Sequence, residues 1–207
     1  MDPFSKLVDF FIRFPGVGSR QAKRFVYFLL TQDIKTLEKF SQLLTELKST
    51  MSQCERCYRF FNAEHTPNAD ICPICDGSNT DKTSMMIIEK YVDIESVRKS
   101  DVYHGRYFVF GGPIPLIQKK YIPKTRLKEL SREIERAVKE DGLKEIIFGF
   151  TVNPEGEHTR EMTLKEIQPL VDKHKLNVTT LGRGLSTGTE LEYSDGDTLK
   201  NALKNRF

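Results

Sequence analysis

The chain has 207 residues, of which 38% are hydrophobic and 29% charged, a composition that allows one to three folded units with a real core. Its longest apolar runs, at residues 85–88 and 146–150, are far too short to span a bilayer, so no membrane role is expected. The net charge is only +3. Any affinity for nucleic acid must therefore come from where lysines and arginines are placed.

Residues 1–50 carry the apolar spacing of three helices. Apolar side chains recur at helical intervals over 4–11, 22–30 and 34–47. Asp2 and Pro3 favour a helix start, with aspartate as the N-cap and proline at the first helical position. A turn at 15–18 ends the first helix, and Ser19 is expected to cap the second. We therefore predict a helical region over 1–52.

The turn between the first two helices holds Gly16 and Gly18, whose spacing permits a tight hairpin with backbone N–H groups pointing outward at the next helix start. Such a turn suits a phosphate group. The helix that follows has one polar face, at positions i, i+3, i+4 and i+7, made of Arg20, Lys23, Arg24 and Tyr27. This pattern favours sequence-independent contact with a nucleic-acid backbone. The alternative is an ordinary pair of antiparallel helices with a solvated basic face.

All four cysteines of the chain fall into two Cys-x-x-Cys pairs with 14 residues between them: Cys54, Cys57, Cys72 and Cys75. A two-residue gap lets both thiolates of a pair reach one ion, and the longer loop brings the second pair round to complete a tetrahedron. The spacing predicts a structural zinc site over 53–76 with no open position for chemistry. Two disulfides are the alternative. They are disfavoured because we find no signal peptide and expect an intracellular protein, in which thiols stay reduced.

From residue 85 onward, short apolar runs alternate with helical patterns, after a polar linker at 76–84. Strands are predicted at 85–88, 107–110, 145–150 and 177–181. Helices are predicted at 93–99, 124–140 and 159–174, and a last amphipathic helix carries Leu199, Ala202 and Leu203. Alternation of this kind predicts βαβ units with a mainly parallel sheet. The expected fold class is therefore multi-domain α/β.

Acidic residues gather where the predicted strands end. Glu89 directly follows the first strand, Asp93 lies four residues on, and Glu155 and Glu157 follow the third strand. The carboxyl edge of a parallel sheet is where such folds bind ligands, so these carboxylates would suit a Mg²⁺ ion. Acidic residues at strand ends also cap helices or supply surface charge, and the sequence does not separate the two interpretations.

Together these segments resemble RecR, a family of bacterial recombination mediators. FPGVG at 14–18 resembles the family's helix-hairpin-helix, and the four cysteines resemble its zinc finger. MIIE at 86–89 with Asp93, and GRYFVF at 105–110, resemble two strands of its Toprim domain. EGE at 155–157 matches its acidic step, and the stretch from RGL at 183–185 to 203 matches its C-terminal signature. Five pieces in the same order make the resemblance specific, although 151–157 and the loop 111–117 depart from the family pattern.

The resemblance implies a protein that is not an enzyme and that acts in DNA repair. RecR-like proteins form ring-shaped tetramers, bind single- and double-stranded DNA, and work with RecO, sometimes with RecF, to load RecA on single-stranded DNA. The family's DNA-facing cations fall here on Arg20 and Arg24. Its Toprim carboxylates, linked to partner docking and ion binding, fall on Glu89, Asp93, Glu155 and Glu157.

The same resemblance assigns roles to the segments of the chain. It implies a helix-hairpin-helix region over 1–52 and a zinc finger over 53–76. A Toprim domain over 84–182 and an oligomerisation segment over 183–207 would follow. We therefore expect a zinc-containing tetramer, or a dimer in exchange with it, at the nucleoid in the bacterial cytoplasm.

The rival function is a Mg²⁺-dependent Toprim enzyme of the nuclease or topoisomerase type. Such chemistry needs a metal site that polarises phosphate, usually with a nucleophile or a nucleotide pocket, and the sequence identifies neither. Glu155 and Glu157 also form a Glu-x-Glu step where catalytic Toprim domains generally carry Asp-x-Asp. A regulator that reads DNA sequence through its zinc module is disfavoured, because no helix rich in Arg, Asn or Gln follows the cysteines.

Overall fold

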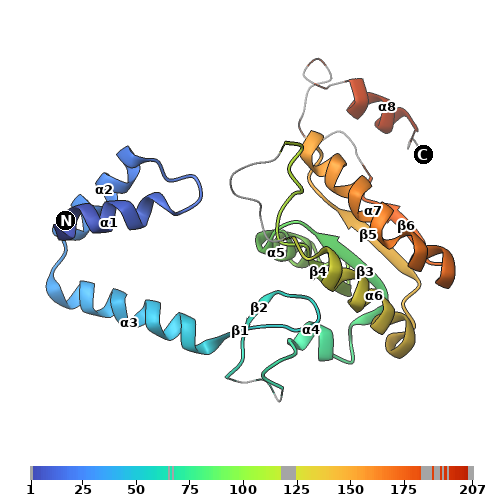
Figure 1. Ribbon diagram of the computed structural model, residues 1–207, viewed down its shortest axis with the longest axis horizontal. Coiled ribbons are helices and arrows are strands. Elements are labelled where there is room, and N and C mark those ends of the chain that lie inside the picture. Colours follow the sequence, from blue (N-terminus) through green and yellow to red (C-terminus); the bar gives the residue numbers. More distant parts are fainter. Residues whose placement is uncertain are drawn as a thin grey trace. The chain divides into compact units, whose positions relative to one another are not determined.

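The structure is a computed structural model and describes residues 2–64, 66, 68–117, 125–182, 188, 192, 194 and 196–204. The chain divides into two compact units, Met1–Met51 and Ser52–Phe207 (Figure 1). A helical N-terminal unit is followed by a four-cysteine cluster and a parallel sheet with helices, which confirms the predicted multi-domain α/β class. The finer division of the second unit stays a prediction.

The first unit consists of α1 (Pro3–Ile12), α2 (Ser19–Leu30) and α3 (Ile34–Thr50), as predicted. The carboxylate of Asp2 caps α1 by accepting a hydrogen bond from the N–H of Ser5 at 3.1 Å. The expected cap of α2 was wrong, because Gly18 is the N-cap and Ser19 is already the first helical residue. The buried residues where α1 and α2 pack are Val8, Ala22 and Val26.

The second unit begins with a small two-stranded sheet in which β1 (Met51–Gln53) lies beside β2 (Phe60–Asn62), followed by the short helix α4 (Pro73–Asp76). A four-stranded sheet follows, in the order β4-β3-β5-β6, and all its pairings are parallel. Its strands are β3 (Asp81–Ile88), β4 (Gly105–Val109), β5 (Glu145–Gly149) and β6 (Asn177–Thr180). Its helices are α5 (Tyr91–Ser100), α6 (Leu127–Asp141) and α7 (Pro154–His174), with α8 (Gly196–Lys204) carrying the predicted last amphipathic helix.

Alternate residues of the central strand β3 face opposite sides of the sheet and build two cores. Met85 and Ile87 pack with Leu130 and Ile134 of α6 and with Ile167 of α7. On the other face, residues 86 and 88 pack with residue 94 of α5. Helices α6 and α7 therefore cover one face of the sheet and α5 the other (Figure 1). A strand covered on both faces explains why 85–88 reads as a continuous apolar run.

The starts of β3 and α7 differ most from the predicted boundaries. Strand β3 starts at Asp81, inside the stretch expected to be a linker. Helix α7 starts at Pro154, five residues before the prediction, because the side chain of Asn153 caps it by accepting from the N–H of Gly156 at 2.7 Å. A Cβ at Gly156 would collide with the carbonyl oxygen of Thr151, so this tight approach requires glycine. Within the described residues, no helix is both long and apolar enough to cross a membrane.

Candidate metal centre and nucleic-acid interface

The four cysteines meet in one buried cluster. Cys54, Cys57, Cys72 and Cys75 are each at most 2% exposed, and their sulfur atoms all lie within 4.8 Å of one another. The Sγ atoms of Cys57 and Cys72 are 3.6 Å apart. Four thiolates around a tetrahedral zinc at about 2.3 Å would place sulfurs about 3.8 Å apart, so the spacing fits such an ion. None of the four is in a disulfide.

Contacts within the cluster favour a thiolate at Cys54, while they raise the pKa values of Cys57 and Cys75. The backbone N–H of Cys72 donates to the Sγ of Cys54 at 3.4 Å, a contact that stabilises charge on sulfur. Hydrogen bonds from neighbouring cysteines, with Cys57 first, lower the pKa of the Cys54 thiol well below its usual range. A thiolate is the form that binds metal. The residues therefore fit a structural metal with four sulfur ligands.

The segment 53–76 that carries the four cysteines, called the metal module below, contacts the edge of the parallel sheet. The N–H of Val109, the last residue of β4, donates to the carbonyl oxygen of Cys57 at 2.9 Å. The guanidinium of Arg126 lies 5.0 Å from the ring centre of Tyr58 and donates to the hydroxyl of Tyr91 at 2.8 Å and to the carbonyl of Val109 at 3.0 Å. One arginine thus joins the residue after Cys57, the edge strand and α5.

In the first unit, the turn before α2 and the exposed face of α2 form one polar surface. Gly16 has φ +77°, and a Cβ at either Gly16 or Gly18 would meet nothing within 4 Å. Because Gly18 is the N-cap and makes no side-chain cap bond, the N–H groups of the first turn are accessible. Three cations follow on the exposed face of the helix: Arg20, Lys23 and Arg24. The predicted separation of faces is confirmed, since Ala22 and Val26 are buried.

The tyrosine of this surface also takes part in the packing of the hairpin. The ring of Tyr27 is 61% exposed and lies 5.1 Å from the ring of Phe4 on α1. Arg24 makes one long hydrogen bond, from Nη1 to the side chain of Gln21 at 3.5 Å. Neither Arg20 nor Lys23 forms an ion pair within the described residues. Their charges are therefore available to an external anion.

Glu89 is the buried member of the predicted acidic group. It follows β3, is 3% exposed, and accepts a hydrogen bond at Oε2 from the Oγ1 of Thr151 at 2.9 Å. Its Oε1 lies 3.4 Å from the Nζ of Lys90. Thr151 stands just beyond β5, so this bond joins the carboxyl ends of two neighbouring strands. The donor and the cation offset part of the cost of burying a carboxylate.

The other three acidic residues lie in first turns of helices. Asp93 caps α5 by accepting at Oδ2 from the N–H of Lys90 at 2.9 Å. Glu155 and Glu157 open α7, and the Oε2 of Glu157 accepts from the Nε of Arg160 at 3.1 Å. These positions favour negative charge because of the helix dipole.

The acidic group is not assembled as a set of ligands for an ion. Among the described residues, only the four cysteines place three or more ligand atoms of His, Cys, Asp or Glu within 4.8 Å of one another. The capping interpretation therefore fits Asp93, and a Mg²⁺ site at this edge stays a prediction.

A buried ionic cluster between β4 and α6 was not predicted from the sequence. Arg106 is 1% exposed, and its Nη1 lies 2.7 Å from Oδ2 of Asp141 while its Nη2 lies 3.4 Å from Oε1 of Glu133. Arg136 also contacts both carboxylates, at 3.0 and 2.6 Å. Burial raises the pKa of Asp141, but the attraction of Arg106 and Arg136 outweighs it, so the net shift is downward. An arginine inside an otherwise apolar strand was the one signal available.

The predicted C-terminal signature falls largely outside the described residues. Residues 183–187, 189–191, 193, 195 and 205–207 are not described, and no contact can be assigned to them.

The fold and the candidate site together define a class of protein. It is a modular α/β protein in which a helical hairpin with exposed cations precedes a four-cysteine cluster and a parallel sheet.

Comparison with known proteins identifies the family. The family model described as RecR, helix-hairpin-helix, matches residues 4–48, and the model described as RecR, C-terminal, matches residues 184–206. Proteins named recombination protein RecR from Chloroflexus aggregans and Lactobacillus helveticus are 31% and 32% identical over 204 residues. The match covers 99% of this chain and 93% and 96% of those proteins. The chain belongs to the RecR family.

Proposed function

We propose that this protein is a DNA-binding recombination mediator that acts in DNA repair. One observation carries the proposal: a member of the RecR family, matched over 99% of its length, presents three exposed cations beside an open glycine turn. Arg20, Lys23 and Arg24 would contact DNA phosphates, with the N–H groups after Gly16 and Gly18 as further donors. Contacts of this kind neutralise the backbone without reading bases, so binding would be independent of sequence.

The metal in the four-cysteine site is proposed to be zinc. Four thiolates with tetrahedral spacing and no open position suit Zn²⁺ in a structural role. When bound, the ion would hold the short segment 53–76 together. Among its described residues, its own core is Phe61 and the cysteines with a few half-buried neighbours.

The carboxyl end of the parallel sheet is proposed as a docking edge for a RecO-like partner, and for a RecF-like partner where one exists. Support comes from Glu89, which the Thr151 hydroxyl fixes in place between two strands, and from the acidic first turn of α7. The region 84–182 would be a Toprim domain in which these carboxylates serve docking, and Mg²⁺ would be an accessory ion there.

Self-association is proposed to build a tetramer or a dimer in exchange with it. Helix α3 buries none of its residues, and four apolar side chains recur along it at helical spacing with exposures of 45–59%: Phe40, Leu43, Leu44 and Leu47. An apolar stripe of this width on a helix normally packs against another surface. The segment 183–207 would be a second oligomerisation element.

A loading assay tests the mediator function. The protein and its RecO-like partner should accelerate RecA filament formation on single-stranded DNA coated with its binding protein. Glu89→Gln and Glu157→Gln should reduce this acceleration and leave DNA affinity within about twofold, because both lie in the second unit, away in sequence from the cations of α2. Glu166→Gln, which removes the same charge from an exposed position farther along α7, is the matched control.

The same preparation separates a mediator from an enzyme. Nicked and supercoiled DNA incubated with the protein and Mg²⁺ should stay unchanged. Mg²⁺-dependent nicking that Glu157→Gln abolishes would replace the mediator proposal with a Toprim enzyme.

A further inference from the structure

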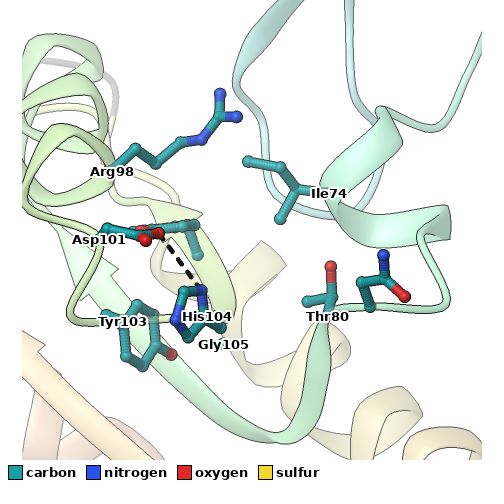
Figure 2. Close-up of a pocket in the computed structure, with 9 residues that line it drawn as sticks. Ile74, Thr80, Arg98, Asp101, Tyr103, His104 and Gly105 are labelled. Atoms are coloured by element: carbon teal, nitrogen blue, oxygen red, sulfur yellow. Dashed lines mark ion pairs between the residues drawn. The ribbon is translucent and has the colours of Figure 1, made fainter.

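A small polar cavity lies between the segment after α4 and the start of β4, at the end of the sheet opposite Glu89. Its volume is about 210 Å³. Figure 2 shows Thr80 on one side, Arg98 extending from the last turn of α5, and His104 on the loop before β4. Tyr107 also lines the cavity. Each of these side chains carries a hydrogen-bond donor.

One buried donor of the lining lacks an acceptor. The hydroxyl of Tyr107, a residue only 3% exposed, has no hydrogen-bond partner among the residues that the structure describes. The neighbouring Tyr103 differs, because its hydroxyl donates to the carbonyl oxygen of Arg106 at 2.8 Å. Buried polar atoms in folded proteins are almost always hydrogen-bonded, to protein or to a bound group. The Tyr107 hydroxyl is therefore a donor without an acceptor in a residue that lines the cavity.

Arg98, which lines the cavity, brings a positive charge to it. Burial raises the pKa of Tyr107, while the positive charges of Arg98 and Arg59 oppose the rise. Within the described ranges, Arg98 has no ion pair. The acidic side chain of the lining, Asp101, is 88% exposed and lies 3.8 Å from the Nδ1 of His104, so solvent screens its charge. The cavity is suited to an acceptor that carries negative charge.

We propose that this cavity binds a phosphoryl group. A phosphoryl group offers several acceptor oxygens at once, and these would take hydrogen bonds from the guanidinium of Arg98 and the hydroxyls of Tyr107 and Thr80. The volume suits a single phosphoryl group better than a nucleotide, since pockets for drug-sized ligands span about 300–1,000 Å³. The bound group would bridge the segment that follows the metal module and the first residues of β4.

The phosphoryl group could come from free phosphate or from the 5′ end of a DNA strand, because the same donors recognise both. Free phosphate can be titrated without DNA. The cavity site can therefore be tested independently of the DNA contacts proposed for α2.

Calorimetric titration of inorganic phosphate into the purified full chain, at an ionic strength held constant with chloride, is the first arm of the test. Arg98→Gln should weaken binding about tenfold or more, because it removes a charge-assisted hydrogen bond, and Tyr107→Phe about two- to tenfold. Lys99→Gln removes the same charge from the adjacent exposed position of α5 and should change the dissociation constant less than about twofold.

The second arm compares oligonucleotides of one sequence with a 5′-phosphate or a 5′-hydroxyl. A preference for the phosphate that Arg98→Gln removes would identify a DNA end as the source, and phosphate binding without such a preference would identify the free ion. Binding in neither arm overturns the proposal. Binding that is insensitive to Arg98→Gln or to Tyr107→Phe overturns it as well.

Stability measurements guard against a simple folding defect. Tyr107→Phe keeps the ring, whose centre lies 5.3 Å from that of Tyr103. Because the hydroxyl has no partner within the described chain, the urea midpoint without phosphate should stay equal or rise, while the stabilisation given by phosphate shrinks. A fall in the phosphate-free midpoint would show that the hydroxyl already serves the fold, and would contradict the proposal.

Discussion

The N–H of Val109 donates a 2.9 Å hydrogen bond to the carbonyl oxygen of Cys57. Val109 ends β4, the outer strand of the parallel sheet, and Cys57 is one of the four candidate metal ligands. Edge strands leave backbone groups unpaired unless something covers them. Here the metal module covers part of the edge. Unfolding of the module should therefore destabilise the end of β4.

Removing the metal should therefore loosen the end of β4. Chelation, or Cys72→Ser, is expected to speed hydrogen exchange of the Val109 amide about tenfold or more, because its acceptor belongs to a module that the metal holds together. The amide of Phe148 in the interior strand β5 is the control and should change much less. Metal analysis of protein purified under reducing conditions should find one zinc per chain. Absence of zinc, or unchanged protection at Val109, would contradict this prediction.

The buried ionic cluster makes stability depend on pH. The pKa of Asp141 is lowered in the folded protein, so its contribution is fully present above the unfolded pKa of about 3.9 and is lost as pH falls through the folded pKa. Asp141→Asn leaves the buried Arg106 without its 2.7 Å partner charge and should cost about 3–5 kcal/mol of unfolding free energy near pH 7.

Urea unfolding at several pH values measures this effect. The difference between the unmodified protein and Asp141→Asn should shrink as pH falls below about 4, where the aspartate becomes protonated. Glu161→Gln, an exposed change on α7, is the control and should stay within about 0.5 kcal/mol. A difference that is constant from pH 7 to pH 3 would show that charge pairing with Arg106 is not the cause.

The apolar stripe of α3 predicts the behaviour of the protein in solution. Leu43→Glu with Leu47→Glu places two charges on side chains that are 52% and 59% exposed in one chain. If this face is buried between copies, the double change should shift the mass measured by light scattering to that of a smaller species, because burying unpaired carboxylates is costly. Gln42→Glu is the control, because it adds a charge next to the stripe without removing an apolar side chain. A monomeric unmodified protein at tens of micromolar would contradict the self-association proposal.

Local patterns predicted the elements well, and long-range pairs escaped them. The cysteine spacing and the helical period of 4–47 depend only on nearby residues, and the structure confirms the cluster and the three helices. Arg106 instead pairs with Asp141, 35 positions away, and Glu89 with Thr151, 62 positions away. The order of the strands in the sheet brings such partners together, and the periodicity of the sequence does not encode that order.

The start of α7 was also predicted less accurately than the helix itself. The apolar period of α7 begins only where its side chains reach the core, whereas the helix itself begins at Pro154, where Asn153 supplies the cap. The cap and the proline were both visible in the sequence. They marked the start of the helix more accurately than the hydrophobic period did.

The most direct test of the central claim is the salt dependence of DNA affinity. If Arg20 and Arg24 neutralise phosphates, Arg20→Ala with Arg24→Ala should weaken binding to unrelated sequences alike. The slope of log affinity against log salt should fall by about one unit for each lost contact. Lys165→Ala with Lys173→Ala removes the same charge from exposed positions on α7 and should leave the slope unchanged. An equal loss of slope in both double variants, or no loss in the α2 variant, would contradict the claim that α2 contacts DNA.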